Sequence, residues 1–219
     1  MPGTAIFDLD RTLTRHGTWS RFVFTISRHR PSFWIRLPVY LGYGLLHVAG
    51  LIDRDGLKER MIRLFLAGRS RAELAARADA FAEAEVATGL RKGARRVVDD
   101  HKARGDRVVI ASAAVDLITN PIADRLGADD AICTRLRWSE DDQLTGHLDG
   151  PSCYGSEKFR RIKATFGDKT LSGPITFYSD HFSDLDALLW VDTGAAVNPE
   201  PKLQAAARQH GLKIEDWNQ

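Results

Sequence analysis

The first residues that could do chemistry are two aspartates at the end of a short apolar run. Asp8 and Asp10 follow the apolar residues 5–7, and Thr12 comes next. If the run is a strand, the two carboxylates point to the same face and converge on one ligand just past its end. Two carboxylates this close repel each other, and a hard cation such as Mg²⁺ would relieve that repulsion. The alternative is that these residues only start a turn or cap a helix, as Asp and Thr often do.

A second acidic cluster follows a later apolar run. Residues 175–179 predict another strand, and Asp180 and Asp184 stand in the segment directly after its end. Both acidic clusters therefore lie at strand ends, which is where open α/β sheets bind their ligands.

Two further polar residues stand near the start of expected helices. Ser112 comes between the buried run 108–111 and a helix that begins at Asp116, where a hydroxyl and backbone N–H groups could hold phosphate. Lys158 falls in the first turn of a helix after Gly155, which is unfavourable for a positive charge unless an anion shares the site. The alternatives are that Ser112 is a helix cap and that Lys158 is a solvated surface lysine.

The elements that must position these residues alternate between strands and helices, which predicts an α/β fold. The expected strands are residues 5–7, 108–111, 175–179, 195–197 and 212–214, the last at the sheet edge. The expected helices are residues 91–104, a helix from Asp116 that Pro121 kinks or breaks, a helix after Gly155, residues 185–191 and a helix from about Lys202 to Gly211. A β-hairpin is expected within residues 131–148, where a polar turn separates two alternating segments.

A basic, helical region interrupts this pattern between residues 15 and 88. Its helical periodicity and a capping box at residues 70–73 indicate an inserted cap. Residues 15–71 hold 11 basic and three acidic side chains, a net charge of +8, against +2 for the whole chain.

Within the cap, residues 33–52 carry one formal charge. They are long enough for a membrane span, but a proline and three glycines make that span a poor one. Two interpretations stay open. The segment is either a pair of cap helices packed on each other and on the core, or a surface that contacts membrane lipid.

Composition and charge narrow the function classes. The 219 residues have room for one or two domains with a sizeable core, and the composition is that of a globular protein. A net charge of +2 gives no reason to expect a nucleic-acid partner. Cys133 and Cys153 give neither a disulfide framework nor a set of metal ligands, which fits a reducing compartment. The chain enters its first strand without a basic leader, so we expect no signal peptide and a cytoplasmic location.

Taken in order, these motifs resemble the haloacid dehalogenase superfamily of phosphohydrolases. Within it, the chain is similar to the phosphoserine-phosphatase-like branch that carries a helical cap. The resemblance covers nearly the whole chain and rests on residues 8–12, Ser112, Lys158, residues 180–184 and residues 197–203. It implies a Rossmann-like parallel sheet core built from residues 1–14 and 89–219, with residues 15–88 as the inserted α-helical cap.

The resemblance also implies a reaction, the hydrolysis of phosphomonoesters. Asp8 would be the nucleophile that forms an aspartyl-phosphate, which splits the hydrolysis into two easier steps. Asp10 would protonate the leaving alcohol and then deprotonate the attacking water. Ser112 and Lys158 would bind the phosphoryl oxygens and offset the charge of the transition state, and Thr12 would brace the loop beside the phosphate.

The same resemblance implies that Mg²⁺ is the cofactor. Asp8, the backbone carbonyl of Asp10, and Asp180 would hold the ion, and Asp184 would act in or near its coordination shell. The ion would neutralise charge between the nucleophilic carboxylate and the phosphate.

Three departures from the family pattern bear on the substrate. Arg11 stands where a small residue is common, and Ser179 precedes Asp180 where glycine is usual. Residues 15–19 lack the glutamate with which phosphoserine phosphatases recognise the amino acid, which argues against phosphoserine as the substrate.

The predicted substrate is a phosphate carried on a lipid or another amphiphile. The cap is basic and aromatic, and some relatives in this branch resemble phosphatidylglycerophosphate phosphatases. The aromatic residues expected to be exposed are Phe33, Trp34, Tyr40 and Tyr43. The cytoplasmic protein would then contact the inner face of an anionic membrane peripherally. One alternative is a phosphatase of a small soluble metabolite, in which the cap buries its apolar face internally. Another is a non-catalytic binding module that uses the fold as a partner platform.

Overall fold

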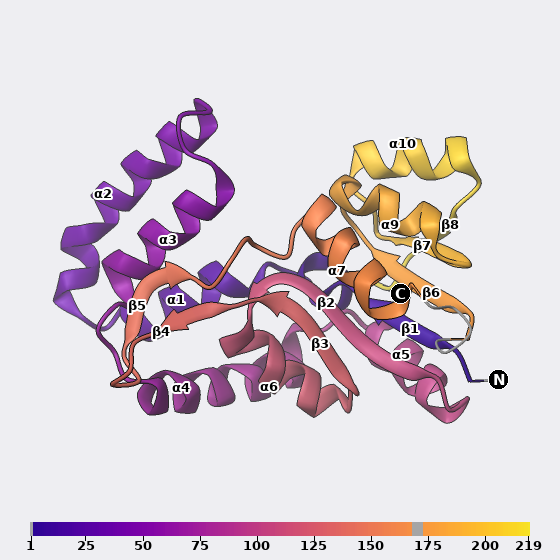
Figure 1. Ribbon diagram of the computed structural model, residues 1–219, viewed down its shortest axis with the longest axis horizontal. Coiled ribbons are helices and arrows are strands. Elements are labelled where there is room, and N and C mark those ends of the chain that lie inside the picture. Colours follow the sequence, from indigo (N-terminus) through magenta and orange to yellow (C-terminus); the bar gives the residue numbers. More distant parts are fainter. Residues whose placement is uncertain (1, 168–172) are drawn as a thin grey trace.

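A six-stranded parallel sheet runs through the centre of the protein (Figure 1). The computed structural model describes residues 2–167 and 173–219. The strand order is β3-β2-β1-β6-β7-β8, and every neighbouring pair is parallel. The strands are β1 (Thr4–Phe7), β2 (Arg107–Val115), β3 (Asp130–Thr134), β6 (Ile175–Ser179), β7 (Thr193–Val197) and β8 (Lys213–Glu215). The predicted α/β fold with a parallel sheet is confirmed.

Strand β1 lies in the middle of the sheet, and all four of its residues are buried. Successive side chains of a strand point to opposite faces. Ile6 accordingly joins one buried cluster together with Phe177, and Phe7 joins a second one together with Ile110. A strand that is buried on both faces is apolar throughout, which is why this segment shows no apolar–polar alternation in the sequence.

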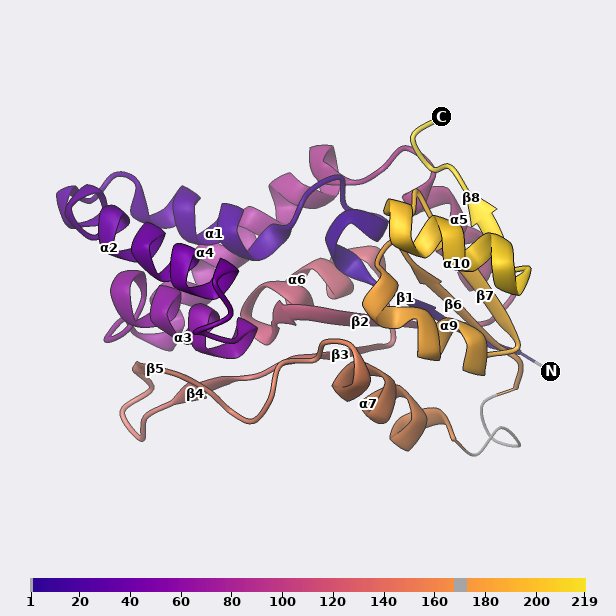
Figure 2. The same ribbon diagram turned by 90° about the horizontal axis from the view of Figure 1, so that it is seen from above.

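Helices cover both faces of the sheet (Figures 1 and 2). Two of the helices on these faces pack into the buried cluster that contains Phe7, which also includes side chains from residues 22–82, and three pack into the cluster that contains Ile6. The first group is α5 (Ala94–Ala103) and α6 (Asp116–Leu126). The second group is α7 (Ser156–Phe166), α9 (Leu185–Trp190) and α10 (Pro201–His210).

Helix α6 is continuous through Pro121, so of the two expected outcomes, a kink or a break, the break is wrong. Pro121 lies close to the start of the helix, and its ring removes a single hydrogen bond, to the carbonyl of Leu117. Ile118 and Ile122 are fully buried and hold the helix against the sheet. Packing therefore outweighs the local cost of the proline.

The hairpin expected within residues 131–148 is confirmed. Residues 130–134 are strand β3, which pairs with β2 at the edge of the main sheet. The antiparallel hairpin consists of β4 (Leu136–Trp138) and β5 (Leu144–Leu148). The expected final edge strand is confirmed as β8.

Of the helices between β1 and β2 in the sequence, four extend beyond one end of the sheet (Figures 1 and 2). They are α1 (Thr18–Ser27), α2 (Pro31–Val48), α3 (Arg54–Phe65) and α4 (Arg71–Ala84). The Ser70 hydroxyl accepts the N–H of Glu73 at 3.3 Å and begins α4, as the capping-box pattern predicts. A π-helical turn over Glu85–Gly89 follows α4.

Residues 33–52 form most of the single helix α2, and the expected pair of helices is wrong. Pro38, Gly42 and Gly44 all lie inside this helix, with their positions facing solvent or half-buried. No helix among the described residues has the length and apolar character needed to cross a membrane.

The aromatic residues of α2 divide between the two sides of the helix. Phe33 is buried against Phe65 of α3, with ring centroids 5.0 Å apart, and Tyr40 is half-buried 5.8 Å from the same ring. Tyr43 is also half-buried, whereas Trp34 is exposed. The expectation of four exposed aromatic side chains is therefore wrong for three of them.

The β4–β5 hairpin reaches away from the six-stranded sheet and lies along the side of the helices of residues 15–88 (Figure 2). Leu144 exchanges two backbone hydrogen bonds with the α3–α4 loop, accepting from Gly68 at 2.9 Å and donating to Arg69 at 3.0 Å. The Arg71 guanidinium stacks 4.4 Å from the ring centre of Trp138. These contacts couple the hairpin to the helices of residues 15–88.

Candidate active site

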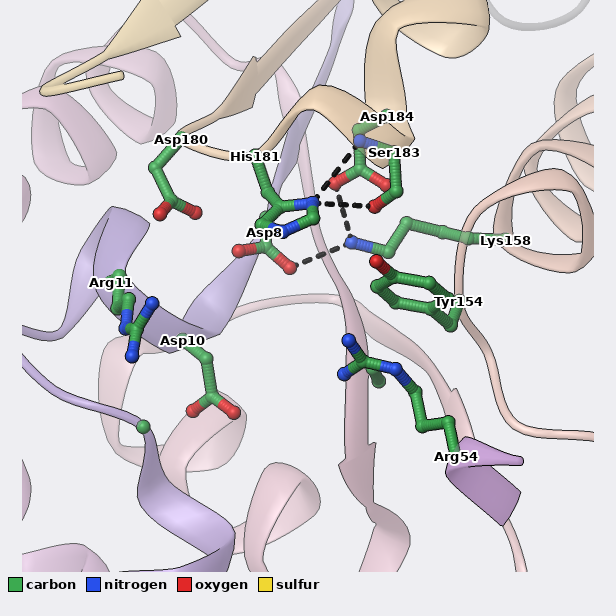
Figure 3. Close-up of a pocket in the computed structure, with 12 residues that line it drawn as sticks. Asp8, Asp10, Arg11, Arg54, Tyr154, Lys158, Asp180, His181, Ser183 and Asp184 are labelled. Atoms are coloured by element: carbon green, nitrogen blue, oxygen red, sulfur yellow. Dashed lines mark hydrogen bonds and ion pairs between the residues drawn. The ribbon is translucent and has the colours of Figure 1, made fainter. Parts of the chain in front are cut away.

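A cavity of about 280 Å³ lies at the carboxyl end of the sheet (Figure 3). Its walls come from the segments after β1 and β6, from β2, from the start of α7 and from α3. Since β2 and β6 both pair with β1, parallel pairing brings these distant segments to one edge. Among the predicted site residues, those that line the cavity are Asp8, Asp10, Lys158, Asp180 and Asp184.

A tight turn after β1 presents the first two aspartates to this cavity. Leu9–Leu13 form a tight turn, η1, in which Asp10 and Arg11 are not helical and Arg11 adopts a φ of 65°. Thr14 donates its N–H to the carbonyl of Leu9 at 3.0 Å, and its hydroxyl oxygen lies 3.0 Å from the same carbonyl and 2.8 Å from the carbonyl of His16. Both leucines of the turn are fully buried. A left-handed φ costs a non-glycine residue about 1 kcal/mol or more, so these surrounding contacts determine the conformation.

Asp8 has both carboxylate oxygens in polar contact. Its Oδ1 accepts from the Lys158 ammonium at 2.7 Å, and its Oδ2 lies 3.0 Å from the Thr12 hydroxyl. Burial is the main cause that raises the pKa of Asp8 to about 7. The positive charge of Lys158 lowers this pKa, and repulsion from Asp184 raises it further. A cation bound beside this carboxylate would favour the ionised form that a nucleophile needs.

Lys158 is a buried cation between two carboxylates. Its Nζ donates to Asp8 Oδ1 and to Asp184 Oδ2, each at 2.7 Å (Figure 3). Burial disfavours its charge, but Asp184 and Asp8 outweigh this effect and raise the pKa of Lys158 above its ordinary value. The alternative of a solvated surface lysine is therefore wrong.

Thr12 connects the two acidic clusters. Its hydroxyl oxygen lies 3.0 Å from Asp8 Oδ2 and 3.1 Å from Asp180 Oδ1, and it accepts the N–H of Asp180 at 3.0 Å. A hydroxyl has one proton, so it donates to one carboxylate at a time. Burial raises the pKa of Asp180, and the hydrogen bond from Thr12 opposes this shift. Thr12 therefore links the carboxylates of Asp8 and Asp180.

Asp184 has one carboxylate oxygen that is unpaired within the described part of the chain. Its Oδ2 accepts from Lys158 and from the hydroxyl of Ser179, both at 2.7 Å. Its Oδ1 is buried and has no hydrogen-bond partner among the described residues. Because a buried unpaired acceptor is costly, this oxygen suits a place beside a cation or a bound water. Ser179, which stands where the family commonly has glycine, therefore has a defined contact.

The oxygen atoms of Asp8, Asp180 and Asp184 are ligands of the kind that Mg²⁺ prefers. No three His, Cys, Asp or Glu side chains in residues 2–167 and 173–219 are grouped tightly enough to hold an ion by themselves. Mg²⁺ is usually bound by one or two carboxylates together with waters and substrate phosphate. The residues present fit a site of that open kind, which the substrate completes.

Asp10 faces the cavity and also caps helix α1. Its Oδ1 accepts from both the N–H and the hydroxyl of Thr18, each at 2.7 Å, and Thr18 is the first residue of α1. Burial raises the pKa of Asp10, and these bonds oppose the shift. The structure therefore brings Asp10 beside the cavity in a setting that favours its protonated form more than water does.

Ser112 lies deeper than expected. It is fully buried, its Oγ accepts the N–H of Ala114 at 3.0 Å, and the neighbouring Ala113 lines the cavity. Strand β2 continues to Val115, with a shift in its register against β3 after Ser112. The alternative of a cap for α6 is wrong because Val115 is the residue before that helix.

Helix α3 contributes two cations that the sequence motifs do not single out. Arg54 lines the cavity, with its guanidinium carbon 3.8 Å from the ring centre of Tyr154 (Figure 3). Lys58 lies one turn further on and donates to the carbonyl of Ala113 at 2.7 Å and to the hydroxyl of Ser152 at 2.9 Å. Burial lowers the pKa of Lys58 to about 8. In the sequence, the indication that Arg54 and Lys58 act together is their spacing of four residues on one helix. Many other basic residues lie near them in the sequence, so this spacing did not single them out.

A protein-family comparison matches residues 5–189 to the haloacid dehalogenase-like hydrolases. Protein CicA from Caulobacter vibrioides is 37% identical over 195 residues, which are 87% of this chain and 84% of that protein.

Two solved structures share the fold. A protein from Bordetella pertussis Tohama I, described as of unknown function, has a TM-score of 0.85 and 26% identity, covering 99% of both chains. A substrate-bound phosphoserine phosphatase has a TM-score of 0.67 and 17% identity, covering 100% of this chain and 95% of that one.

Proposed function

Since this chain belongs to the haloacid dehalogenase-like hydrolase family, we propose that it hydrolyses phosphomonoesters through an aspartyl-phosphate on Asp8, with Mg²⁺ as cofactor. The family and the enzyme class predicted from the motifs, a phosphoric monoester hydrolase, are confirmed at the level of the family. The observation that carries the proposed mechanism is the buried carboxylate of Asp8, held between Lys158 and Thr12 inside the cavity.

In the first step, a carboxylate oxygen of Asp8 forms a bond to phosphorus, and the bond from phosphorus to the substrate oxygen breaks. Asp10 donates its proton to that leaving oxygen, so the product leaves as an alcohol. The raised pKa of Asp10 supports this role. The contacts of Asp10 with Thr18 fix the orientation of the carboxyl group before the substrate arrives.

In the second step, Asp10 takes a proton from a water molecule, which attacks phosphorus and releases phosphate and free Asp8. Lys158 supplies positive charge to the phosphoryl oxygens, and its ammonium is already held 2.7 Å from Asp8. The hydroxyl of Ser112 accepts the N–H of Ala114, so Ser112 would contribute by fixing the backbone conformation at the end of β2.

The residues that would hold Mg²⁺ are Asp8, Asp180 and the backbone carbonyl of Asp10, with Asp184 in or near the shell. The unpaired Oδ1 of Asp184 and the Thr12 link between Asp8 and Asp180 support this assignment. When bound, the ion neutralises charge between the carboxylate and the phosphate.

We further propose that residues 15–88 act as a cap over a core of residues 1–14 and 89–219. Arg54 and Lys58 of α3 support this division because they reach the cavity from the cap side. The cavity of about 280 Å³ has room for a phosphate and the first atoms of its alcohol, so a long substrate must extend past Arg54 and Tyr154.

For the alcohol, a lipid or another amphiphile is the proposed carrier, presented at an anionic membrane surface. The exposed apolar side chains of α2 support it. A small soluble phosphomonoester is the second candidate, supported by the modest cavity volume. A screen of phospholipid and soluble phosphomonoesters with Mg²⁺, measuring released phosphate, distinguishes these two candidates.

The Asp8→Asn variant tests the mechanism. It keeps the shape of the side chain and removes the nucleophile, so p-nitrophenyl phosphate hydrolysis with Mg²⁺ should fall at least about a thousandfold, or roughly 4 kcal/mol in the barrier. Circular dichroism should show an unchanged fold. A variant that keeps more than about a tenth of the activity, roughly 1.4 kcal/mol, contradicts a covalent role for Asp8.

A further inference from the structure

One half of the surface of α2 is entirely apolar. Residues of a helix are rotated by about 100° from one to the next, so the positions of α2 divide between two sides. The outer side carries apolar residues and glycine, and its large side chains are Trp34, Ile35, Val39, Leu41, Leu45, Leu46 and Val48. They are exposed to solvent, with Ile35 at 77%, Leu45 at 73% and Val48 at 86%.

The polar residues of α2 lie on its inner side. Arg36 donates to the carbonyl of Leu64 at 2.7 Å, and a ring nitrogen of His47 lies 2.7 Å from the carbonyl of Ile52. Phe33 is the buried anchor on this side. The outer side is therefore left without any charged group to keep it in water.

This apolar surface is concentrated at one place. Among the described residues, eight of the eleven large apolar side chains that are exposed lie in residues 34–51. Figures 1 and 2 both place α2 at the end of the molecule furthest from the sheet. An exposed apolar patch on a projecting element marks a surface that binds a membrane or another protein.

The charges around α2 distinguish between these occupants. The sequence has no acidic residue between Asp10 and Asp53, and Arg28 and Arg30 stand just before α2, with Arg30 in an exposed ion pair with Glu73 at 3.1 Å. A second copy of this chain, docked by the same face across a two-fold axis, would bring these arginines close to each other. An anionic lipid surface instead attracts them while it accepts the apolar side chains.

We propose that α2 lies in the plane of an anionic membrane, with its outer side among the upper acyl chains and Arg28 and Arg30 at the headgroups. The helix has 18 residues and is therefore about 27 Å long, which gives it a long line of contact. It rests on the surface and does not cross it, as the placement of Arg36 and His47 on one side requires.

This placement also brings the cavity to the membrane. Residues 49–53 join the end of α2 to Arg54, which lines the cavity. A connection this short keeps the cavity mouth near the exposed side chains of Val48 and Leu51. This last step rests on the proposed phosphatase function, whereas membrane binding by α2 does not.

The test is co-sedimentation of the full chain with vesicles of phosphatidylcholine alone or mixed with phosphatidylglycerol, at low and high salt. We expect binding to the anionic vesicles that weakens as salt rises, because screening shortens the reach of the arginines. Leu45→Ser with Val48→Ser should lower the partition coefficient at least about tenfold, since two apolar side chains leave the acyl region. The matched control is Leu189→Ser with Ile214→Ser, two exposed apolar residues on α9 and β8, which should bind as the wild type does.

The charge contribution is tested in the same assay. Arg28→Gln with Arg30→Gln should lower binding to anionic vesicles about tenfold and reduce its salt dependence. Arg96→Gln with Arg208→Gln removes two exposed charges far from α2 in the sequence and should leave binding unchanged.

Three results would overturn the proposal. In the first, the wild-type protein does not bind anionic vesicles at low salt. In the second, the α2 serine variant binds these vesicles as tightly as the wild type. In the third, analytical ultracentrifugation shows that the wild type is a dimer and that the serine changes dissociate it. Turnover of p-nitrophenyl phosphate, measured on every variant, keeps the two proposals apart. If the wild-type protein binds vesicles but does not hydrolyse p-nitrophenyl phosphate, the proposed function is contradicted and the proposal of membrane binding by α2 is not.

Discussion

At the scale of single residues, Asp10 combines a structural contact with its proposed proton transfer. Asp10→Asn keeps an oxygen that can accept from Thr18, so the midpoint temperature of unfolding should change by only about 2 °C. Turnover should fall about 10²- to 10⁴-fold, because the amide cannot donate or accept the transferred proton. The loss in the first step should be larger for an alkyl phosphate than for p-nitrophenyl phosphate, whose leaving group needs less protonation. Burst kinetics with both substrates measure this, and equal losses would count against the acid role.

The raised pKa of Asp8 makes the stability of the metal-free protein depend on pH. Between the ordinary value of 3.8 and about 7, the folded state keeps a proton that the unfolded state loses, so stability falls as pH rises through this range. Asp8→Asn does not titrate. In EDTA the variant should therefore unfold at a higher temperature than the wild type at about pH 8, and the difference should shrink by about pH 5. Added Mg²⁺ should stabilise the wild type more than the variant. A difference that does not change with pH contradicts the raised pKa.

The acidic residues of the site were predictable because each follows a short apolar run, which favours a buried strand. The sequence places Asp8, Asp10 and Asp180 at strand ends, and parallel strands end at one edge. The contacts of Arg54 and Lys58 were not predictable in this way. Lys58 meets the carbonyl of Ala113, 55 residues further along the chain, and only the packing of α3 on the sheet edge brings the two together.

At the scale of elements, α3 reaches the cavity through Arg54. Arg54→Met removes a positive charge at the cavity wall, so KM should rise about tenfold for phosphomonoesters that carry a second negative charge. For p-nitrophenyl phosphate, which has no second charge, KM should stay within about threefold. The matched control is Arg60→Met on the same helix, since Arg60 stacks 5.1 Å from the ring centre of Tyr43 and does not line the cavity. Equal effects of the two changes would rule out a specific role for Arg54.

Helix α2 shows where element prediction from sequence fails. Pro38 and two glycines favour a break, yet the chain stays helical because Phe33 and Tyr40 both pack on Phe65 of α3. The interpretation of residues 33–52 as a pair of helices is therefore wrong, because tertiary contacts stabilise one long helix. The helices with clear start signals, such as Ser70 before α4, were located correctly.

At the scale of the whole molecule, β1 is the element on which the sheet depends. Ile6→Ala should lower the free energy of unfolding by about 2–4 kcal/mol, because Ile6 is fully buried in the central strand and the cavity left behind cannot collapse. Ile214→Ala, on the edge strand β8, should cost under about 1 kcal/mol. Urea unfolding of both variants measures the difference. If both variants lost the same free energy of unfolding, the central and edge strands would contribute equally to stability, which contradicts this prediction.

The position of β1 has a consequence for synthesis on the ribosome. β1 is made long before either of its neighbours, since Thr4 pairs with Arg107 on one side and with Ile175 on the other. Helices α1 to α4 are also made before β2, although α3 and α4 contact β5 and α6, which come later in the chain. A nascent chain that ends near residue 100 therefore exposes an unpaired central strand and the apolar side of α2 at the same time. Exposed apolar surface and unpaired strand edges favour aggregation, so we expect the nascent chain to be most prone to aggregation during this interval.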